Sequence, residues 1–262
     1  MKELENTRVL ITGGSVRIGR EIALHFARNG AKVVVHYNRS ERKARTLLEQ
    51  LNEISSGHQC VCADLLKEKE RRELLPALLE KGQKLNCLVN NASVYRRCPL
   101  VNVDLHRFMQ DYEINFVAPF ILMCEFAHYC EEGNIINLLD QRVATVDPSA
   151  STYGFAKKSL RDATEAAAVQ WAPRIRVNAV APGIVLPARG IDNDKMERLL
   201  KNVPMAQTSS AEEVANACLF LAKAETITGQ ILYVDGGMHL APPTVSEADQ
   251  ANYEADHDDL DD

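Results

Sequence analysis

Apolar residues occur along the chain in short, nearly continuous runs, and longer stretches with a helical spacing of apolar positions lie between them. The first helical stretches cover about residues 18–29, 40–54 and 67–81. The apolar runs predict about seven strands, at residues 8–12, 31–37, 58–65, 85–93, 133–140, 175–183 and 229–237.

This alternation predicts an α/β fold, a single doubly wound domain of Rossmann type with helices on both faces of its sheet. Strands that are apolar throughout and are separated by long helices form parallel sheets covered on both sides. The crossovers between such strands are right-handed. With no internal repeat and no linker before the C-terminal segment, we assign one domain to residues 1–240. Ligands of such sheets bind at the carboxyl ends of the strands.

The net charge of −6 comes from the C-terminal segment at residues 241–262. From Ala241 onward there are eight acidic residues and no Lys or Arg. The remaining 240 residues hold 30 basic and 28 acidic residues, a net charge of +2. This near balance offers no concentrated basic face, so we expect no nucleic-acid partner. The strongly charged segment is predicted to be a disordered tail, with a partner-binding tail as the alternative.

Cysteine usage and hydropathy favour a cytoplasmic protein. The seven cysteines, an odd number, lie at 60, 62, 87, 98, 124, 130 and 218 without a recurring CxxC pair, so we expect reduced thiols and no metal site. No apolar run approaches the roughly 20 residues that span a bilayer, so no membrane association is expected. The N-terminus begins with charged residues and enters a strand at once, unlike a signal peptide.

The segment "TGGSVRIGR" (12–20), which joins the first strand to the first helix, is typical of a dinucleotide-binding turn. Gly13 and Gly14 permit a tight turn and a close approach of backbone to phosphate. Gly19 lets the helix pack closely on the sheet. The N-terminus of the helix offers unpaired N–H groups and a positive dipole to a pyrophosphate.

The end of the second strand favours NADPH over NADH. An acidic residue there would bind the ribose 2′-hydroxyl of NAD, but "VVVHYNRSERK" has none before Glu41. Arg39 and Ser40 can instead donate to a 2′-phosphate, and Arg17 adds a cation. The alternative is that Arg39 is simply solvated. Asp64, after the third strand, either bonds the adenine or caps the next helix.

Tyr153 and Lys157 are four residues apart, which places them on one face of a helix. A free tyrosine loses its proton near pH 10. The Lys157 ammonium is expected to lower the pKa of Tyr153 toward neutrality and to hold a nicotinamide ribose. Tyr153 then acts as a general acid toward a substrate that receives hydride. Asp140, which ends a buried strand thirteen residues earlier, adds a carboxyl group.

The motifs that surround these residues are "TGGSVRIG", "ADL", "LVNNAS", "INFVAPF", Tyr153-x-x-x-Lys157, "IRVNAVAPG" and "YVDGG". On these motifs the chain resembles the short-chain dehydrogenase/reductase family over about residues 5–240. The resemblance implies a catalytic set of Asn115, a residue of the fifth strand, Tyr153 and Lys157. Asn115 would hold a water that links Lys157 to solvent, and Asn91 would line the cofactor cleft and steady the fourth strand. It also implies a homotetramer with the catalytic helix in an interface.

Together with the first turn, the resemblance implies an NADPH site around a larger set of residues. His36 is expected to pack near the adenosine without a chemical role. The set comprises Gly13, Ser15, Arg17, Ile18, Gly19, His36, Tyr37, Asn38, Arg39, Ser40, Asp64, Leu65, Asn91, Ala92, Ser93, Lys157, Pro182 and Gly183.

Two departures from the family pattern resemble its pteridine reductase branch. Asp140 stands where most members have Ser, and Arg17 where many have Gly; "HYNRS" (36–40) is a third likeness. In that branch the Asp, Tyr and Lys act together, and the arginine reaches the pterin or the cofactor phosphates. An aromatic residue two positions after the serine of "NNAS" stacks on the pterin, here Tyr95 after Ser93.

The implied substrate contacts are therefore Arg17, Ser93, Tyr95, Asp140, Tyr153 and Leu186, with residues 184–210 as a lid. A carboxyl group at Asp140 suits a pterin, whose ring nitrogens need a partner that accepts and donates hydrogen bonds. Asp140 as a helix cap or loop acid, and Tyr95 as a simple cover of the cleft, are the alternatives. Arg96 and Arg97 are expected to be solvated.

The leading hypothesis is an NADPH-dependent reductase of dihydropterins or dihydrofolate, and so an enzyme of tetrahydrobiopterin or folate metabolism. A reductase of the same family acting on a 3-oxoacyl thioester or a small ketone is the alternative. A catalytically silent NADPH-binding protein is a third reading, against which Tyr153, Lys157 and Asn115 argue. The substrate is a small molecule under the first two readings.

Overall fold

The computed structural model describes residues 4–241, except for residues 6, 99, 149, 186–192 and 202. Within this part of the chain, seven parallel strands form one sheet in the order β3-β2-β1-β4-β5-β6-β7. The predicted doubly wound α/β fold is confirmed. The predicted tail falls almost entirely outside the described residues.

The strands occupy the predicted apolar runs but are shorter at their ends. Their bounds are β1 Arg8–Ile11, β2 Lys32–Tyr37, β3 Gln59–Cys62, β4 Cys87–Asn90, β5 Gly133–Leu138, β6 Ile175–Pro182 and β7 Ile231–Val234. The central strands are buried along almost their whole length, whereas β3 and β7 at the two edges are partly exposed. Continuous burial of the central strands explains why their sequences lack an alternation of apolar and polar residues.

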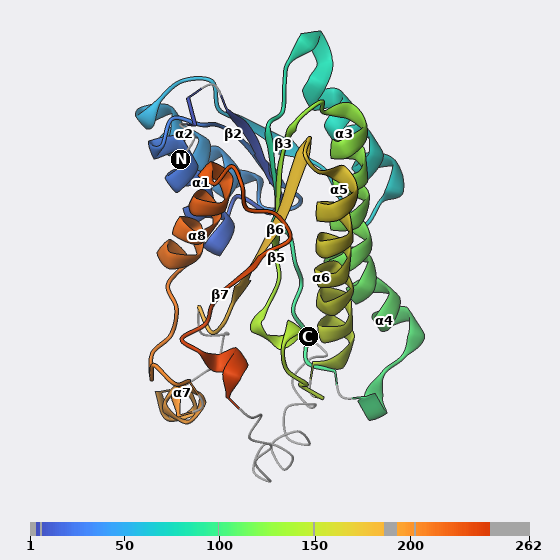
Figure 1. The fold of residues 1–262 in the computed structure, drawn as a ribbon, viewed down its shortest axis with the longest axis vertical. Coiled ribbons are helices and arrows are strands. Elements are labelled where there is room, and N and C mark those ends of the chain that lie inside the picture. Colours follow the sequence, from blue (N-terminus) through green and yellow to red (C-terminus); the bar gives the residue numbers. More distant parts are fainter. Residues whose placement is uncertain are drawn as a thin grey trace.

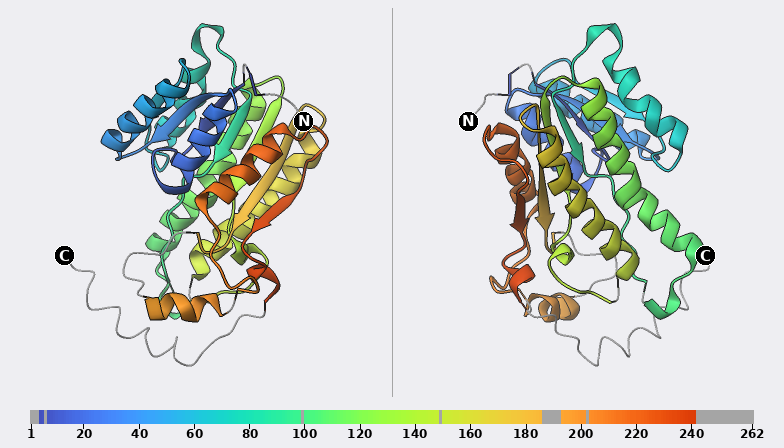
Figure 2. Two further views of the ribbon diagram at one scale, coloured as in Figure 1. Left: turned by 90° about the vertical axis from the view of Figure 1, so that its left-hand side faces the viewer. Right: turned by 45° about the vertical axis from the view of Figure 1, so that its right-hand side comes forward.

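Helices cover both faces of the sheet (Figures 1 and 2). One face carries α1 Arg17–Arg28, α2 Glu41–Ile54 and α8 Ala211–Lys223. The other carries α3 Glu68–Leu79, α4 Leu105–Tyr112, α5 Ala118–Tyr129 and α6 Ser151–Trp171. The short helix α7 Asn193–Leu200 lies at the lower end of the molecule in Figure 1. In α1 the buried side chains recur every three to four residues, which gives the helix a single apolar face.

The direction of winding reverses between β1 and β4. The chain runs from β1 outward through β2 to β3, and then returns to place β4 on the other side of β1. The turn after β1 and the loop after β4 therefore leave the sheet edge beside each other. This reversal creates a crevice at the carboxyl ends of the strands, where doubly wound sheets bind their ligands.

A π-helix, Glu113–Val117, interrupts the helical stretch between α4 and α5. The Ala118 N–H donates to the Glu113 carbonyl, five residues back. Pro119 has no N–H, so it cannot donate to the Asn115 carbonyl four residues before it. The wider turn brings Asn115 to the sheet edge, a change of helix type that the apolar periodicity did not predict.

Candidate active site

In the turn between β1 and α1, a side chain at Gly13 or Gly19 would meet other parts of the chain. Gly13 has a φ of 59°, and a Cβ there would lie 3.0 Å from the Ala92 Cα atom. A Cβ on Gly19 would press on the Gly13 carbonyl oxygen and lie 2.5 Å from Asn91 Nδ2. That Nδ2 donates to the carbonyl oxygens of Thr12 (2.9 Å) and Gly13 (3.0 Å). Asn91 thus fastens the loop after β4 to the turn after β1.

The first turn of α1 is open toward the crevice. Its N-cap residue, Val16, offers no side-chain acceptor, and no acidic residue lies in the first turn. The first N–H groups of a helix have no partner within the helix, and they lie at the positive end of its dipole. Arg17 begins α1 with an exposed side chain and a φ of 52°. Such a left-handed conformation costs a non-glycine residue on the order of 1 kcal/mol.

His36, near the end of β2, holds this turn in place. Its ring Nδ1 accepts from the Gly13 N–H (3.1 Å), and its Nε2–H donates to the Ala63 carbonyl (3.0 Å). The His36 carbonyl also accepts from the Gly14 N–H (2.9 Å). Burial lowers the pKa of His36 to about 4, against smaller opposing effects of Ala63 and Asp64. The neutral ring is therefore a structural part of the turn.

Acidification is expected to destabilise the fold through His36. The pKa is lowered in the folded state, so its contribution is complete above the unfolded value of about 6.5 and is lost as pH falls toward 4. Between pH 7 and pH 4.5 the loss is about 2 kcal/mol. Urea unfolding of the wild type and of His36→Asn should show a pH dependence that is weaker in the variant by this amount. If the free energy of unfolding changed with pH equally in the two proteins, His36 would not be the group responsible.

Hydroxyl, amide and cationic groups gather where β2 ends and the turn after β1 approaches it. The Ser15 and Ser40 hydroxyls lie 2.9 Å apart, and Arg39 is exposed beside them. Asn38 donates to Asp64 Oδ1 (3.3 Å).

The helix-cap alternative for Asp64 is wrong, because the N-cap residue of α3 is Lys67. Asp64 Oδ1 instead accepts from the Leu66 N–H (3.1 Å), a local turn. The Asp64 N–H donates to Glu70 Oε2 (2.6 Å).

Tyr153, Asp140 and Lys157 meet where β5 and α6 come together. Tyr153 lies in the first turn of α6, and its hydroxyl donates to Asp140 Oδ2 (3.1 Å). Lys157 lies one turn further along, with Nζ 5.7 Å from the Tyr153 ring centroid, and donates to the Leu138 carbonyl (2.7 Å). Asp140 also accepts from the Arg142 N–H and so caps a short 3-10 helix, Gln141–Val143. It is a cap and a partner of Tyr153 at once.

The pKa of Tyr153 is raised, and the prediction that Lys157 lowers it is wrong for this arrangement. Burial is the main cause, and the Asp140 carboxylate adds to it. Arg142 and Ser93 oppose the rise. Burial lowers the pKa of Lys157 to about 8, partly offset by Asp140. Tyr153 therefore keeps its proton at neutral pH and can act as a donor, whereas Lys157 is close to releasing one.

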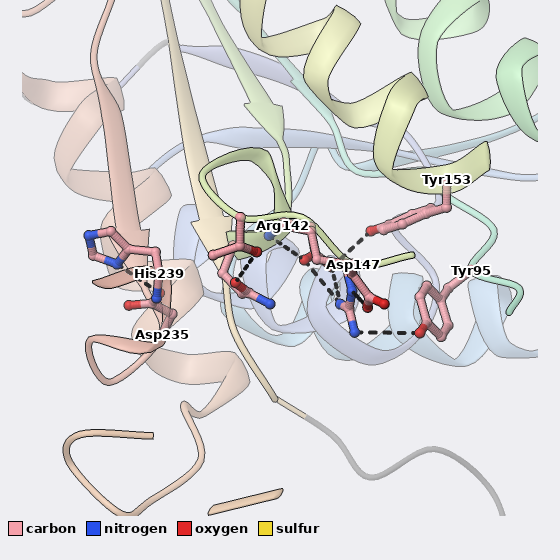
Figure 3. Close-up of polar contacts among 9 residues, drawn as sticks. Tyr95, Arg142, Asp147, Tyr153, Asp235 and His239 are labelled. Carbon is pink, nitrogen blue, oxygen red and sulfur yellow. Dashed lines mark hydrogen bonds and ion pairs between the residues drawn. The ribbon is translucent and has the colours of Figure 1, made fainter. Parts of the chain in front are cut away.

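Arg142 is the residue of this site that sequence reasoning missed. Its guanidinium contacts both Asp140 and Asp147, and it lies over the Tyr95 ring (Figure 3). Burial alone would lower the pKa of Arg142, but Asp140, Tyr95 and Asp147 outweigh it and raise the pKa. Its position two residues after Asp140, in the segment that follows β5, was the available signal.

Tyr95 closes the site on the side of the loop after β4. Its ring meets that of Tyr153 edge to face, with centroids 5.1 Å apart and planes at 89°. The Tyr95 hydroxyl accepts from Arg142 at 3.4 Å. About 42% of Tyr95 is exposed, so part of the side chain remains accessible beside Tyr153.

Ser93 and Asn115 are joined directly. Ser93 Oγ donates to Asn115 Oδ1 (2.6 Å), which also accepts from the Val94 N–H. Asn115 Nδ2 donates to the carbonyl oxygens of Val94 and Asp111. Protein groups thus use both ends of the amide. The water predicted at Asn115 stays a prediction.

Arg96 is paired with a buried acid, which corrects the expectation that it is solvated. Its NH1 lies 3.0 Å from Asp111 Oδ1, and Asp111 is fully buried. The other oxygen, Oδ2, accepts from Thr152 (2.9 Å), the residue before Tyr153. Asp111 therefore anchors the loop that carries Tyr95 to the start of α6.

Comparison with known proteins agrees with this arrangement. A family model described as enoyl-(acyl carrier protein) reductase matches residues 15–239. The 3-oxoacyl-[acyl-carrier-protein] reductase FabG of Staphylococcus epidermidis is 30% identical over 243 residues, 90% of this chain and 100% of that protein. The chain belongs to the short-chain dehydrogenase/reductase family.

Solved structures of this family are similar as well. FolM alternative dihydrofolate reductase 1 from Brucella suis, in complex with NADP, matches with a TM-score of 0.86 and 31% identity, over 92% of this chain and 98% of that one. The corresponding protein from Brucella canis, also complexed with NADP, has a TM-score of 0.85 and 30% identity, over 94% and 100%. This short-chain dehydrogenase/reductase is accordingly an oxidoreductase.

In this short-chain dehydrogenase/reductase, the residues predicted around the cofactor come from the carboxyl ends of five strands with the segments that follow them, and from α6, along the same sheet edge. They lie after β1 (Gly13, Ser15, Arg17, Ile18, Gly19), at the end of β2 (His36, Tyr37, Asn38, Arg39, Ser40), after β3 (Asp64, Leu65), after β4 (Asn91, Ala92, Ser93), in α6 (Lys157) and at the end of β6 (Pro182, Gly183). A Cβ on Gly183 would lie 2.8 Å from the Asp235 backbone, so this turn also needs glycine. Leu186 lies outside the described residues.

Asp235, after β7, is a further buried acid. It accepts from the Gly237 and His239 N–H groups and from the His239 ring (Figure 3). The His239 ring stacks on Tyr233 at 3.9 Å. These contacts fix the last 3-10 helix, Met238–Leu240, which touches the Gln141–Val143 helix.

Two findings concern the described part of this reductase as a whole. No described helix is both long and apolar enough to cross a membrane. No disulfide bond joins its cysteines, and Cys87, Cys98, Cys130 and Cys218 are buried. Cys62, by contrast, is exposed.

Proposed function

We propose that this chain is an NADPH-dependent reductase of a pterin, of the dihydrobiopterin, dihydromonapterin or dihydrofolate type. The observation that carries the proposal is the hydrogen bond from the Tyr153 hydroxyl to the Asp140 carboxylate, whose oxygens lie 3.1 Å apart. The partly exposed Tyr95 ring beside Tyr153 supports it, because it offers a flat ligand a stacking face. The solved relatives named as alternative dihydrofolate reductases add support.

The residues present fit a phosphorylated dinucleotide. The uncapped N-terminus of α1 and the glycine at position 13 would receive the pyrophosphate. Ser40 and Arg39 would bind the 2′-phosphate, because β2 ends without the acid that would bind a ribose 2′-hydroxyl. Lys157 would hold the nicotinamide ribose. When bound, NADPH supplies the hydride.

The chain itself supplies position and a proton. Reduction of the C=N bond of a dihydropterin adds hydride to the carbon and a proton to the neighbouring nitrogen. The Tyr153 hydroxyl and the Asp140 carboxylate share one proton, and the raised pKa of Tyr153 keeps it in place until the nitrogen gains basicity. Lys157, with a pKa of about 8, then returns a proton toward the Tyr153 phenolate. Asp140 meanwhile accepts an N–H of the ring.

The alternative function is reduction of a ketone, such as a 3-oxoacyl thioester. It is favoured by the 30% identity to 3-oxoacyl-[acyl-carrier-protein] reductase FabG. A carbonyl oxygen needs only a donor, which Tyr153 provides. A carboxylate 3.1 Å from that donor has no task in carbonyl reduction, and for this reason we place the pterin first.

A substrate panel tests the proposal. NADPH oxidation is followed with dihydrobiopterin, dihydromonapterin, dihydrofolate and an acetoacetyl thioester, and each assay is repeated with NADH. We expect the highest kcat/KM with a dihydropterin or dihydrofolate, and tighter binding of NADPH than of NADH. Turnover of the thioester alone would replace the pterin reductase by the ketoreductase. NADPH binding without any turnover would favour the silent protein.

We further propose a cytoplasmic homotetramer. Large apolar side chains are exposed on α4, α5 and α6, the layer that contains the catalytic helix (Figure 2). They include Leu105, Met109, Phe120, Phe155 and Val169. Such a surface is typical of a subunit interface. A mass near four times 29.1 kDa by light scattering would support the tetramer, and a monomer would exclude it.

A further inference from the structure

Arg142 joins the acid, the stacking ring and the loop of the site through one guanidinium (Figure 3). Its Nε donates to Asp147 Oδ2 (2.7 Å). Its NH1 lies 3.1 Å and 3.2 Å from the two carboxylate oxygens of Asp140, and its NH2 donates to the Tyr95 hydroxyl (3.4 Å). The guanidinium carbon lies 5.1 Å from the Tyr95 ring centroid. Arg142 thus contacts two of the predicted substrate residues, Asp140 and Tyr95, with one side chain.

These contacts determine which oxygen of Asp140 faces Tyr153. Oδ1 accepts from the Arg142 backbone N–H (2.9 Å) and from its NH1. Oδ2 is left for the Tyr153 hydroxyl, with a second contact from NH1. Every group around Asp140 in this arrangement is a donor, so the carboxylate only accepts. The shared proton therefore rests on the phenol.

We infer that Arg142 is a positioning residue that acts through Asp140 and so sets the substrate class of the site. It turns one carboxylate oxygen toward Tyr153 and toward an N–H donor of the ligand, and it holds Tyr95 at the same time. A heterocycle that offers N–H donors and a flat face fits this arrangement, whereas a ketone does not use it. The choice of substrate rests on the proposed function.

The surroundings make this ion pair more than a surface contact. The side chains of Arg142 and Asp140 are 23% and 15% exposed, so solvent screens their attraction only in part. Asp140 faces Arg142, Tyr153 and Lys157, and Arg142 faces Asp147 and Tyr95. Without the guanidinium, the site loses the cation nearest to Asp140, so the acid limb of the pH profile of the rate is expected at higher pH.

The first test is Arg142→Gln, measured as kcat/KM for the dihydropterin across pH. Misplacement of a reacting group by about 1 Å costs about 10²-fold, and we expect a loss of that order at pH 6. The loss should be smaller at pH 8.5, because the acid limb of the profile moves to higher pH. Arg142→Lys keeps the positive charge but loses the forked geometry of the guanidinium. Compared with Arg142→Gln, it should therefore restore the pH profile but only part of the rate.

The matched control is Arg72→Gln on α3, which removes another arginine from an ion pair, with Glu68, at an exposed site. It should leave both the rate and the pH profile unchanged. Thermal unfolding of all variants separates a loss of fold from a loss of position. An Arg142→Gln protein with wild-type kinetics at every pH would overturn the inference.

A double-mutant cycle with Asp140→Asn decides whether Arg142 acts through Asp140. If it does, the double variant is no slower than Asp140→Asn alone. If the two losses multiply, Arg142 acts independently and the inference is wrong. Should the wild type reduce only the thioester, the proposed function fails, and the cycle is then run with that substrate. If the losses of the two single variants multiply with that substrate, the inference is wrong there too. If they do not multiply, Arg142 still acts through Asp140.

Discussion

Tyr153→Phe is expected to lower kcat/KM for the accepted substrate by about 10³-fold, within the range of a lost general acid. The variant removes the one O–H that donates to Asp140 and keeps the ring that meets Tyr95 edge to face. Asp140 retains its contacts with Arg142, so the carboxylate should stay in place. The affinity for NADPH should not change, because the lost hydroxyl lies on the substrate side. Steady-state kinetics and a fluorescence titration with NADPH measure the two effects.

The matched control is Tyr129→Phe, which removes a hydroxyl from an exposed tyrosine of α5. It should behave as the wild type in both measurements. If Tyr153→Phe retained more than a tenth of the activity, the proton would have to come from another group. Asp140 or Lys157 would then be the source to test.

Gly19→Ala is expected to weaken NADPH binding by about 10²-fold. The added Cβ would meet the Gly13 carbonyl oxygen and lie 2.5 Å from Asn91 Nδ2, atoms of the turn and of the loop fastened to it. Relieving such overpacking costs up to about 3 kcal/mol. If the whole of this free energy is lost from the binding of NADPH, the affinity falls by about 10²-fold. Titration with NADPH and urea unfolding measure the two consequences.

Gly154→Ala is the control for this prediction, since a Cβ there meets no atom within 4 Å. Gly154 lies inside α6, where alanine is favoured over glycine by about 1 kcal/mol. The control should bind NADPH normally and unfold at a slightly higher urea concentration. Equal NADPH affinity in the Gly19 and Gly154 variants would show that the turn can move without harm.

Much of the fold could be predicted because its signals are local. Each strand of the sheet is an apolar run, and the glycines of the first turn indicate where the crevice lies. The spacing of Tyr153 and Lys157 places both on one helix face, and the structure brings Asp140 to the same point. The strand ends were predicted two to three residues too long in several cases. At these strand ends the chain leaves the sheet and its side chains make other contacts, which the pattern of apolar residues does not predict.

The sequence failed where a role depends on distant partners. Tyr95 and Arg142 are 47 residues apart and meet in the site. Arg96 looked solvated, yet it pairs with Asp111, whose burial comes from the packing of α4 and α6. His36 looked like a lining residue, but its ring joins the glycine turn, through Nδ1, to the Ala63 carbonyl after β3, through Nε2.

The sequence by itself determined the doubly wound sheet, the crevice at its carboxyl edge and the pairing of Tyr153 with Lys157, because apolar periodicity and residue spacing act within one element at a time. Only the tertiary structure decided the electrostatics of the site. The pKa of Tyr153 rises where Lys157 alone would have lowered it, because burial and the Asp140 carboxylate outweigh Arg142, the cation that the fold brings close. Burial and the distance between charges are properties of the folded chain, and they set the charge state of each group.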